Sequence, residues 1–236
     1  MSISRRDFLT GSAISIGGLL GGVLQVPFAS IANAASPDIA HGSRSVPKVA
    51  LTFHGAGDLK IAHSLLNILN SAKTPVTVFA VGTFLASEPT IAKTILDGGH
   101  DLGNHTMTHT QMKTISAARV DAEIAGCANE LKKLIGNHGK WFRPSGTQYS
   151  TALIRKTALK YGYKNCISYD VDSHDYQDPG KAAVLKNVSK DVKNGSIISL
   201  HFGHQNTIDA LPTLIENLHA KGLTPVTLTE LLGGAA

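Results

Sequence analysis

From residue 46 onward, short apolar runs rich in β-branched residues alternate with segments in which apolar side chains recur every three or four positions. Seven such runs predict strands, at residues 46–53, 75–81, 101–103, 140–143, 165–171, 196–202 and 225–228. One intervening helical face is formed by Val120, Ile124, Cys127, Leu131 and Leu134. The runs are almost continuously apolar, which is typical of parallel strands covered on both sides. This alternation predicts an α/β domain, and seven strand–helix units within about 190 residues favour a distorted (β/α)7 barrel over an open doubly wound sheet.

The composition of the chain excludes several other classes of protein. Of its 236 residues, 42% are hydrophobic and 17% are charged, so neither a disordered chain nor a multi-span membrane protein is expected. The sequence has no Gly-x-Gly-x-x-Gly segment after the first predicted strand and no Walker loop, which argues against nucleotide binding. Its basic residues form no run longer than two and are not interleaved with aromatic residues, so we expect no nucleic-acid partner.

The first 34 residues have the pattern of a cleavable export signal. Arg5 and Arg6 precede a weakly apolar stretch at residues 11–28, and a small-x-small sequence follows at 32–34. This order predicts export by the twin-arginine machinery to the periplasm or the extracellular space, with no stable membrane span after cleavage. The alternative, a retained membrane anchor, is disfavoured by the glycines and serines within the apolar stretch. The predicted parts are a twin-arginine signal peptide at 1–34, a short linker at 35–45 and a single catalytic domain at 46–236.

The chain has two cysteines, Cys127 on a predicted helical face and Cys166 in a predicted strand. After export they would meet an oxidising compartment, where a disulfide is allowed. Both positions are also typical of buried free thiols. The sequence leaves these two alternatives open.

Polar residues gather directly after the predicted strands. In a parallel α/β fold, side chains beyond the carboxyl ends of the strands meet at one edge. Five strands bring polar residues to this edge, namely His54 with Asp58, His105 with His109, Arg143, Asp172 with Asp175, and His201. His105 and His109 are four residues apart, so on a helical turn both imidazoles reach one divalent ion, and a carboxylate from another strand would complete the site. The same spacing is found in surface pairs and in capping side chains, so the neighbouring carboxylates strengthen the metal hypothesis.

Three other residues at this edge suit hydrolytic chemistry, and two of them, Arg143 and His201, have a structural alternative. Arg143 either orders a loop carboxylate or holds a catalytic one. Gly146 could direct a backbone N–H at a developing oxyanion. His201 is either a core histidine or a general acid stabilised by an aspartate of the segment 170–175.

These segments, in this order, resemble the NodB-type polysaccharide deacetylases, which form carbohydrate esterase family four. The resemblance covers about residues 46–232. The matches are His105-Thr106-Met107-Thr108-His109 for His-Ser/Thr-x-x-His, Arg143-Pro144 for the Arg-Pro motif, Asp172-Ser173-His174-Asp175-Tyr176 for Asp-x-x-Asp-Trp, and His201 for the strand that ends in histidine. Four motifs in the family's order are more specific than any one of them.

The resemblance implies a distorted barrel of the NodB homology type in a single domain. It also implies a metal-dependent hydrolase that removes N-acetyl groups, or O-acetyl groups, from a carbohydrate polymer such as a cell-wall or chitin-like glycan. The implied cofactor is a divalent metal, expected to be zinc. The implied roles are metal binding for His105 and His109, proton donation for His201 oriented by Asp175, positioning of the base for Arg143, and substrate binding for Gly146 and Tyr176.

The first motif departs from the family pattern. Its usual form is Thr-Phe-Asp-Asp-Gly, in which the first Asp acts as base and the second binds the metal, but here Thr52-Phe53 is followed by His54 and Gly55. Asp58 is the nearby carboxylate that could serve as third ligand or as base, and His54 is the candidate for the other role. Two further readings therefore stay open: an inactive carbohydrate-binding protein on the same fold, and a related amidase acting on non-carbohydrate amides.

Overall fold

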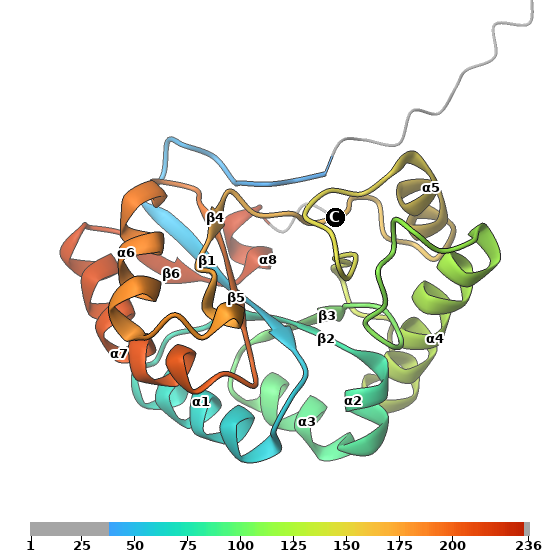
Figure 1. Ribbon diagram of the computed structural model, residues 1–236, viewed down its shortest axis with the longest axis horizontal. Helices are drawn as coiled ribbons and strands as arrows, with labels where there is room; N and C mark the ends of the chain where they lie inside the picture. The colour runs from blue at the N-terminus through green and yellow to red at the C-terminus, as the bar shows by residue number, and fades with distance from the viewer. Residues whose placement is uncertain (1–37, 234–236) are drawn as a thin grey trace, which may run out of the picture. The chain divides into compact units, whose positions relative to one another are not determined.

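A computed structural model describes residues 38–233 of the chain. Its strands are β1 (Lys48–Gly55), β2 (Thr77–Ala80), β3 (Asp101–Asn104), β4 (Val171–Asp172), β5 (Ile197–His201) and β6 (Thr224–Val226). They form one sheet in the order β3-β2-β1-β5-β4, with β6 beside the first residues of β1, and all of these pairs are parallel. β1 and β5 lie at the centre of the fold with the helices outside them (Figure 1). The predicted α/β fold with a parallel sheet is confirmed.

Single bridging residues continue this sheet where two longer strands were predicted. Phe142 pairs with Asn104 of β3 on one side and with Cys166 on the other, and the segment that contains Cys166 runs on into β4. The expected strand at 140–143 therefore reduces to one bridge, because Pro144 lacks an N–H and disfavours further pairing. The bridges close the sheet into a distorted barrel, and the described residues lie in one compact unit.

Helices cover the outside of the barrel. They are α1 (Leu59–Ser71), α2 (Gly82–Ser87), α3 (Pro89–Asp97), α4 (Ala117–Ile135), α5 (Ala152–Lys160), α6 (Lys181–Asp191), α7 (Gln205–Ala220) and α8 (Leu228–Leu231), and a 3₁₀ turn, η1, spans Asp175–Gln177. α4 begins where the Ser116 hydroxyl accepts the N–H of Arg119 and ends at Gly136 in the left-handed region, with φ 77°. Within residues 38–233, none of these helices has both the length and the apolar character needed to cross a bilayer.

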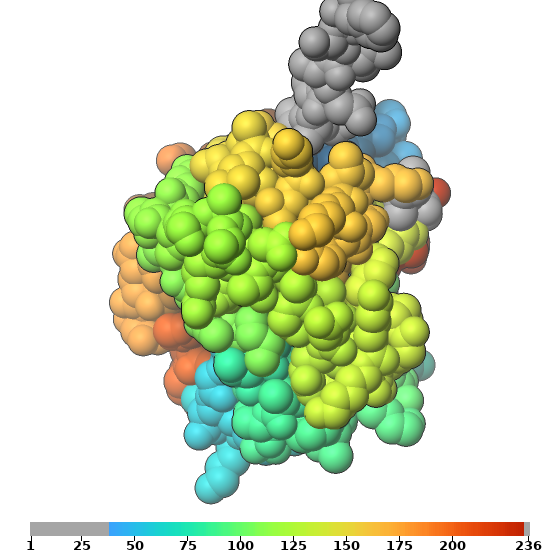
Figure 2. All heavy atoms as spheres, turned by 90° about the vertical axis from the view of Figure 1, so that its right-hand side faces the viewer, coloured from blue at the N-terminus to red at the C-terminus, as the bar shows by residue number. Residues whose placement is uncertain are grey.

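α4 and α5 cover the irregular part of the barrel. A buried cluster joins Val120 and Ile124 of α4 and Ile154 of α5 to Phe142 and Cys166. Figure 2 shows this side of the molecule, where the green-to-yellow segment forms a continuous layer of atoms. Apolar packing thus replaces regular strand pairing as the support of the segments that carry Arg143 and Pro144.

The two cysteines are free and buried, Cys127 in α4 and Cys166 at the bridge to Phe142. Burial raises the pKa of each thiol to about 12. Of the two alternatives left by the sequence, the structure shows two buried thiols.

The predicted signal peptide and residues 35–37 of the predicted linker lie outside the described residues. The rest of that linker lies against the barrel, where Ile39 pairs with Ile167 and His41 pairs with Ser196. The N–H of Ser168 donates to the carbonyl of Ile39 over 2.8 Å. Residues 38–41 thus extend the irregular edge of the sheet.

The register of the strands sets the position of the polar residues. His54 on β1 lies directly opposite His201 on the neighbouring β5. β3 ends at Asn104, so His105 follows it at the same end of the sheet. The carboxyl ends of β1, β3 and β5 therefore bring three histidines to one edge, as predicted.

Candidate functional site

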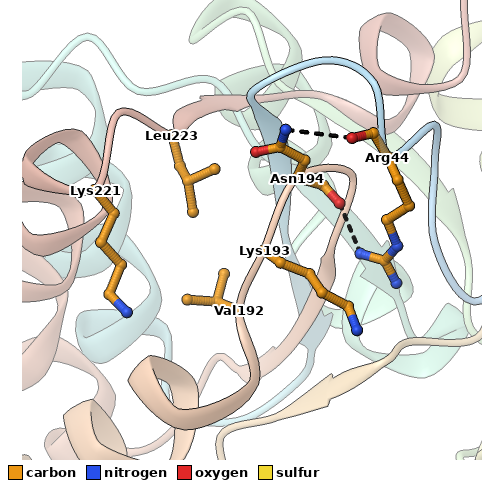
Figure 3. Close-up of a pocket in the computed structure, with 6 residues that line it drawn as sticks. All are labelled: Arg44, Val192, Lys193, Asn194, Lys221 and Leu223. Atoms are coloured by element: carbon orange, nitrogen blue, oxygen red, sulfur yellow. Dashed lines mark hydrogen bonds between the residues drawn. The ribbon is translucent and has the colours of Figure 1, made fainter.

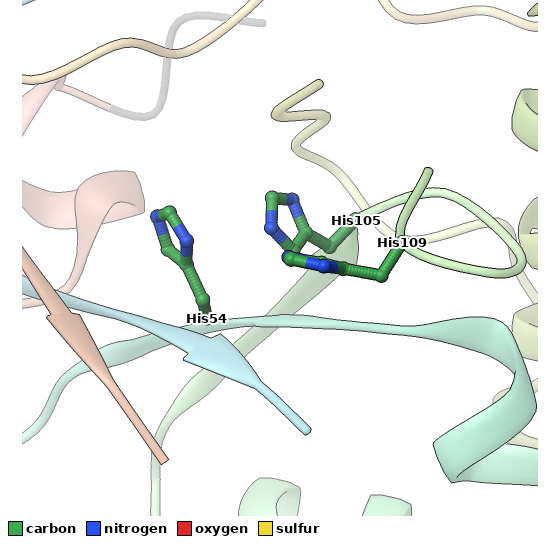
Figure 4. Close-up of side chains that lie close together, drawn as sticks. All are labelled: His54, His105 and His109. Atoms are coloured by element: carbon green, nitrogen blue, oxygen red, sulfur yellow. The ribbon is translucent and has the colours of Figure 1, made fainter. Parts of the chain in front are cut away.

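Three histidine side chains form a compact group at this edge. His54 lies on β1, and His105 and His109 lie in the loop after β3. One nitrogen of each ring lies within 4.8 Å of the others, and the rings are turned toward one another in Figure 4. Among residues 38–233 this is the one group of three or more His, Cys, Asp or Glu side chains close enough to hold a metal ion.

The hydrogen bonds of His105 show that its ring suits a metal. Its Nδ1 lies 2.8 Å from the carbonyl oxygen of Arg143, which only accepts, so Nδ1 carries the proton and Nε2 has the free lone pair. Nε2 is buried and has no hydrogen-bond partner. A buried acceptor without a partner costs about 1–3 kcal/mol, which a bound cation would offset. A metal-binding histidine whose other nitrogen donates to a carbonyl is the usual arrangement.

The protonation states of the three rings also suit a metal. Burial lowers the pKa of His54 and of His105 well below 6.5. The charge of Arg143, and the charge that each neighbouring histidine would gain on protonation, lower both further, although the hydrogen bond to the carbonyl of Arg143 opposes this at His105. The pKa of His109 is lowered by burial and by His201, although Glu123 opposes this effect. Neutral imidazole is the form that binds metals. The three histidines therefore fit a divalent ion such as zinc, which accepts imidazole nitrogen.

Asp58, expected as the third ligand, has a different place. Its Oδ1 accepts the N–H groups of Lys60 over 2.8 Å and Ile61 over 3.1 Å, so the carboxylate caps the first turn of α1. The group near enough to hold an ion does not include it. A carboxylate between a strand and a helix suits a helix cap as well as a ligand. The third member of the group that could hold an ion is His54, and His54, His105 and His109 are called the metal group below.

Glu123 of α4 holds the loop that carries His109. Its buried carboxylate accepts the N–H of Thr108 over 2.7 Å and the Thr108 hydroxyl over 2.6 Å, and it pairs with Arg119 over 2.8 Å. Thr106 and His109 both adopt left-handed backbone, with φ of 71° and 56°, which costs about 1–3 kcal/mol each. The buried anchor offsets this strain and fixes the second histidine of the motif.

Arg143 is buried and holds His54. Its Nη1 lies 3.1 Å from Nε2 of His54 and donates to the Thr52 hydroxyl over 2.9 Å, and the rest of the guanidinium donates to the carbonyls of Ile167 and Ser168. Burial lowers the pKa of Arg143 to about 9, against opposing effects of Tyr169 and Asp172. The sequence led us to expect a catalytic carboxylate beside this arginine, but the structure places His54 there, since His54 occupies the position of the family's first aspartate.

His201 and Asp175 form a hydrogen-bonded pair beside the three histidines. Nδ1 of His201 lies 2.7 Å from Oδ1 of the buried Asp175, and Oδ2 accepts the backbone N–H of His201 over 2.8 Å. Burial alone would raise the pKa of Asp175, but hydrogen bonds from His201 and Thr207 and the charge of His201 bring it below the ordinary value. An ionised Asp175 fixes the proton of His201 on Nδ1 and leaves Nε2 free for proton exchange.

Two of the three histidines, His54 and His109, line one cavity of about 310 Å³ together with His201. Its walls are His54, His109, Gln111, Pro144, Gly146, Thr147, Gln148, Tyr169, Tyr176 and His201. Gly146 has φ 63°, and a Cβ there would lie 2.6 Å from the Gln111 side chain, so the position favours glycine. Tyr176 is 44% exposed, and its ring lies edge-on to His201 with centroids 5.2 Å apart. The two residues expected to bind substrate, Gly146 and Tyr176, thus lie at the same cavity as the histidines.

Several wall residues had no sequence signal of their own. Gln111 and Gln148 lie in loops with no motif, and Tyr169 lies in a segment predicted only as strand. His174 and His204, which had no assigned role, lie beside Asp172 and Asp178, at 3.7 Å and 3.2 Å. Apart from its three histidines, the wall of the cavity consists mostly of the uncharged amides of Gln111 and Gln148 and the aromatic rings of Tyr169 and Tyr176.

A second cavity, of about 490 Å³, lies where the segments before β1, β5 and β6 meet. It is lined by Arg44, Val192, Lys193, Asn194, Lys221 and Leu223 (Figure 3). Arg44 is already neutralised there, because its Nη2 lies 2.7 Å from Oδ2 of Asp170 and its Nη1 donates to the carbonyl of Asn194. This cavity is at the amino-terminal ends of the strands and its lining contains no histidine or carboxylate.

Two comparisons of the sequence with known proteins found similar proteins. A family model described as "Polysaccharide deacetylase" matches residues 41–166. A peptidoglycan-N-acetylglucosamine deacetylase of Bacillus cereus is 30% identical over 188 residues, which cover 78% of this chain and 87% of that protein.

Two solved structures are similar to this fold. A family 4 carbohydrate esterase from Streptomyces lividans, in complex with acetate, is 30% identical with a TM-score of 0.70, and the match covers 76% of this chain and 91% of that one. BA3943 of Bacillus anthracis, described as a pseudoenzyme of family CE4, is 26% identical with a TM-score of 0.76, and the match covers 82% of this chain and 68% of that one.

Proposed function

This chain belongs to the polysaccharide deacetylase family, and on that premise we propose that it is a metal-dependent hydrolase that removes N-acetyl, or O-acetyl, groups from a carbohydrate polymer. The observation that carries the proposal is the shared cavity, in which His54 and His109 of the metal group face the His201–Asp175 pair. A metal group and a proton-transfer pair at one cavity are the two components that amide hydrolysis needs.

His54, His105 and His109 would hold the metal ion, for which zinc is our proposal. When bound, the ion supplies Lewis-acid polarisation of the acetyl carbonyl and of the attacking water. Gly146 lies at the cavity wall, and its backbone N–H would donate to the developing oxyanion.

His201 would carry a proton from the attacking water to the leaving amine. The water that attacks the acetyl carbon loses one proton, and the amine gains one when its bond to that carbon breaks. Nε2 of His201 can accept the first proton and return it, because Asp175 holds Nδ1–H through a 2.7 Å hydrogen bond and stabilises the imidazolium. His54, held by Arg143, is the alternative acceptor of the proton from water. The products are acetate and a free amine.

The wall of the cavity favours a neutral sugar as substrate. Gln111 and Gln148 offer amide groups to hydroxyls and acetamido groups, and Tyr169 and Tyr176 offer aromatic faces. The relative from Bacillus cereus is named for peptidoglycan N-acetylglucosamine, so we propose a cell-wall or chitin-like glycan of this sugar for the present chain.

A cell-wall substrate agrees with export. We propose that the twin-arginine pattern at residues 1–34 directs the protein to the periplasm or the extracellular space. Replacing Arg5 and Arg6 together by lysine should leave the uncleaved precursor in the cytoplasm, which cell fractionation with immunoblotting measures. Unchanged export of this variant would contradict the twin-arginine route.

The direct test of the proposed function is release of acetate. The purified zinc-loaded protein is incubated with N-acetylated chitooligosaccharides, peptidoglycan, O-acetylated glycans and small cyclic ureides. We expect acetate from an N-acetyl glycan, and a rate about 10²–10⁴-fold lower for His201→Gln. Cleavage of ureides alone would favour an amidase acting on non-carbohydrate amides.

The second candidate is carbohydrate binding without hydrolysis. It is favoured by the absence of both carboxylates from the first motif, where His54 and Gly55 stand, and by the similarity to BA3943. Saturable glycan binding with no acetate release, under zinc, cobalt or manganese, would establish this function and refute the hydrolase.

A further inference from the structure

We propose that Thr207 is a positioning residue that locks the carboxylate of Asp175 and, through it, the ring of His201. The role in proton transfer rests on the proposed function, whereas the locking of the ring does not. Thr207 lies outside every motif of the family resemblance, in the first turn of α7.

The two oxygens of Asp175 have separate partners. The Thr207 hydroxyl lies 2.6 Å from Oδ2, and because an ionised carboxylate only accepts, the hydroxyl is the donor. Oδ2 also accepts the backbone N–H of His201 over 2.8 Å, which leaves Oδ1 for Nδ1 of the His201 ring over 2.7 Å. The carboxylate is thus held at one oxygen by two donors and presents the other to the catalytic ring.

Among these hydrogen-bond donors to Asp175, Thr207 provides the one side chain that does not belong to the His201–Asp175 pair. Both Thr207 and Asp175 are buried, with 1% and 0% of their surface exposed, so water cannot replace the hydroxyl without entering the core. Without it, only a backbone N–H would hold Oδ2, and rotation of the carboxylate would change the direction of the hydrogen bond to His201.

The hydrogen bond also ties three elements together. Asp175 begins η1, His201 ends β5 and Thr207 belongs to α7. The backbone N–H of Thr207 donates to the carbonyl of His204 over 3.1 Å, so the backbone that carries the Thr207 hydroxyl is fixed at the start of α7. The docking of α7 therefore sets the orientation of His201 in the cavity.

Loss of the Thr207 hydroxyl should lower turnover rather than substrate binding. Thr207→Val removes the donor at nearly constant volume, and we expect kcat to fall about 10–100-fold with KM within twofold, since misplacing a reacting group lowers the chemical step. Thr207→Ser keeps the hydroxyl and should retain most of the activity. Thr157→Val is the matched control, because the Thr157 hydroxyl is buried to a similar degree but bonds to Leu153 within α5, away from the cavity.

A proton NMR measurement on the zinc-loaded protein tests the locking without any assay. The downfield resonance of the His201 Nδ1 proton, assigned by its loss in His201→Gln, should persist in Thr207→Ser and Thr157→Val and should shift upfield or vanish in Thr207→Val. If Thr207→Val does not fold, Thr207→Ala is measured in its place. An unchanged resonance and unchanged kcat in the variant without the hydroxyl would overturn the proposal. A shifted resonance in a protein that releases no acetate from any substrate would support the locking and refute the proposed hydrolase instead.

Discussion

Nε2 of His54 lies 3.1 Å from Nη1 of Arg143. A guanidinium only donates, so this contact favours the ring form in which Nε2 has the lone pair and Nδ1 carries the proton. The Ser199 hydroxyl, 3.4 Å from the same Nε2, can accept and so suits the opposite form, in which Nδ1 is free to bind a metal. His54 thus has a partner for each of its two neutral forms, and in the second of them Nδ1 has the free lone pair that either a metal ligand or a base needs.

Replacing His54 separates these roles. If His54 is a ligand, His54→Ala should lower zinc affinity by at least ~10-fold, since even partners of metal ligands have effects of this size. His201→Ala, which lies outside the metal group, is the control and should bind zinc like the original protein. Competition with a chelating dye measures both. Unchanged zinc affinity in His54→Ala together with loss of acetate release would instead make His54 the base.

Gly55 stands where the resemblance places the metal-binding aspartate, and the structure leaves no room for a side chain there. A Cβ at this position would lie 2.8 Å from Cγ1 of Val78 and 3.1 Å from the Cα of Ala80. Gly55→Asp should therefore lower the free energy of unfolding by about 1–3 kcal/mol, the usual cost of overpacking, without tightening zinc binding. Urea unfolding checks the first effect, and Gly55→Ala should show a similar loss because the crowding arises at Cβ. A fully stable Gly55→Asp with higher zinc affinity would contradict this account.

Local patterns predicted most of the regular elements and the loop that carries His105 and His109, because those depend on residues close in sequence. β1 differs from its predicted range by two residues at each end, and the apolar residues of α4 from Val120 to Leu131 are buried on one face. Asp58 illustrates the limit, since a carboxylate between a strand and a helix fits a ligand and a helix cap equally well. Thr207 had no signal at all, because its contact with Asp175 joins residues 32 positions apart.

Glu123 should support both the fold and the metal. Its carboxylate accepts two hydrogen bonds from Thr108 and pairs with Arg119. Glu123→Gln should lower the free energy of unfolding by about 1.5–3 kcal/mol, the range for hydrogen bonds to a charged group. It should also weaken zinc binding, because His109 lies directly after Thr108.

Glu130→Gln is the matched control for this change. Glu130 lies on the same helix and pairs with the exposed Lys133 over 3.2 Å, so its loss should cost less than about 1 kcal/mol and leave zinc affinity unchanged. Thermal unfolding and dye competition measure the two effects. Equal behaviour of the two variants would mean that Glu123 does not anchor the loop.

The lowered pKa of Asp175 predicts how stability depends on pH. In the unfolded chain this group titrates near 3.8, and in the folded protein its pKa lies below that value, because the hydrogen bonds from His201 and Thr207 outweigh the effect of burial. The unfolded state therefore binds the proton first, so the stabilisation is complete above the unfolded value and is lost as pH falls through the folded one.

The comparison with Asp175→Asn isolates this effect. The difference in free energy of unfolding between the original protein and the variant should be constant from about pH 5 upward and should shrink steadily below pH 3.8. Urea unfolding at a series of pH values, followed by far-UV circular dichroism on the metal-free proteins, gives the two curves. A difference that stays constant down to pH 2 would show that Asp175 does not titrate with a lowered pKa. A difference that already shrinks between pH 7 and pH 5 would show that its pKa is raised, which would make Asp175 a neutral partner of His201 rather than the anion that holds its Nδ1 proton.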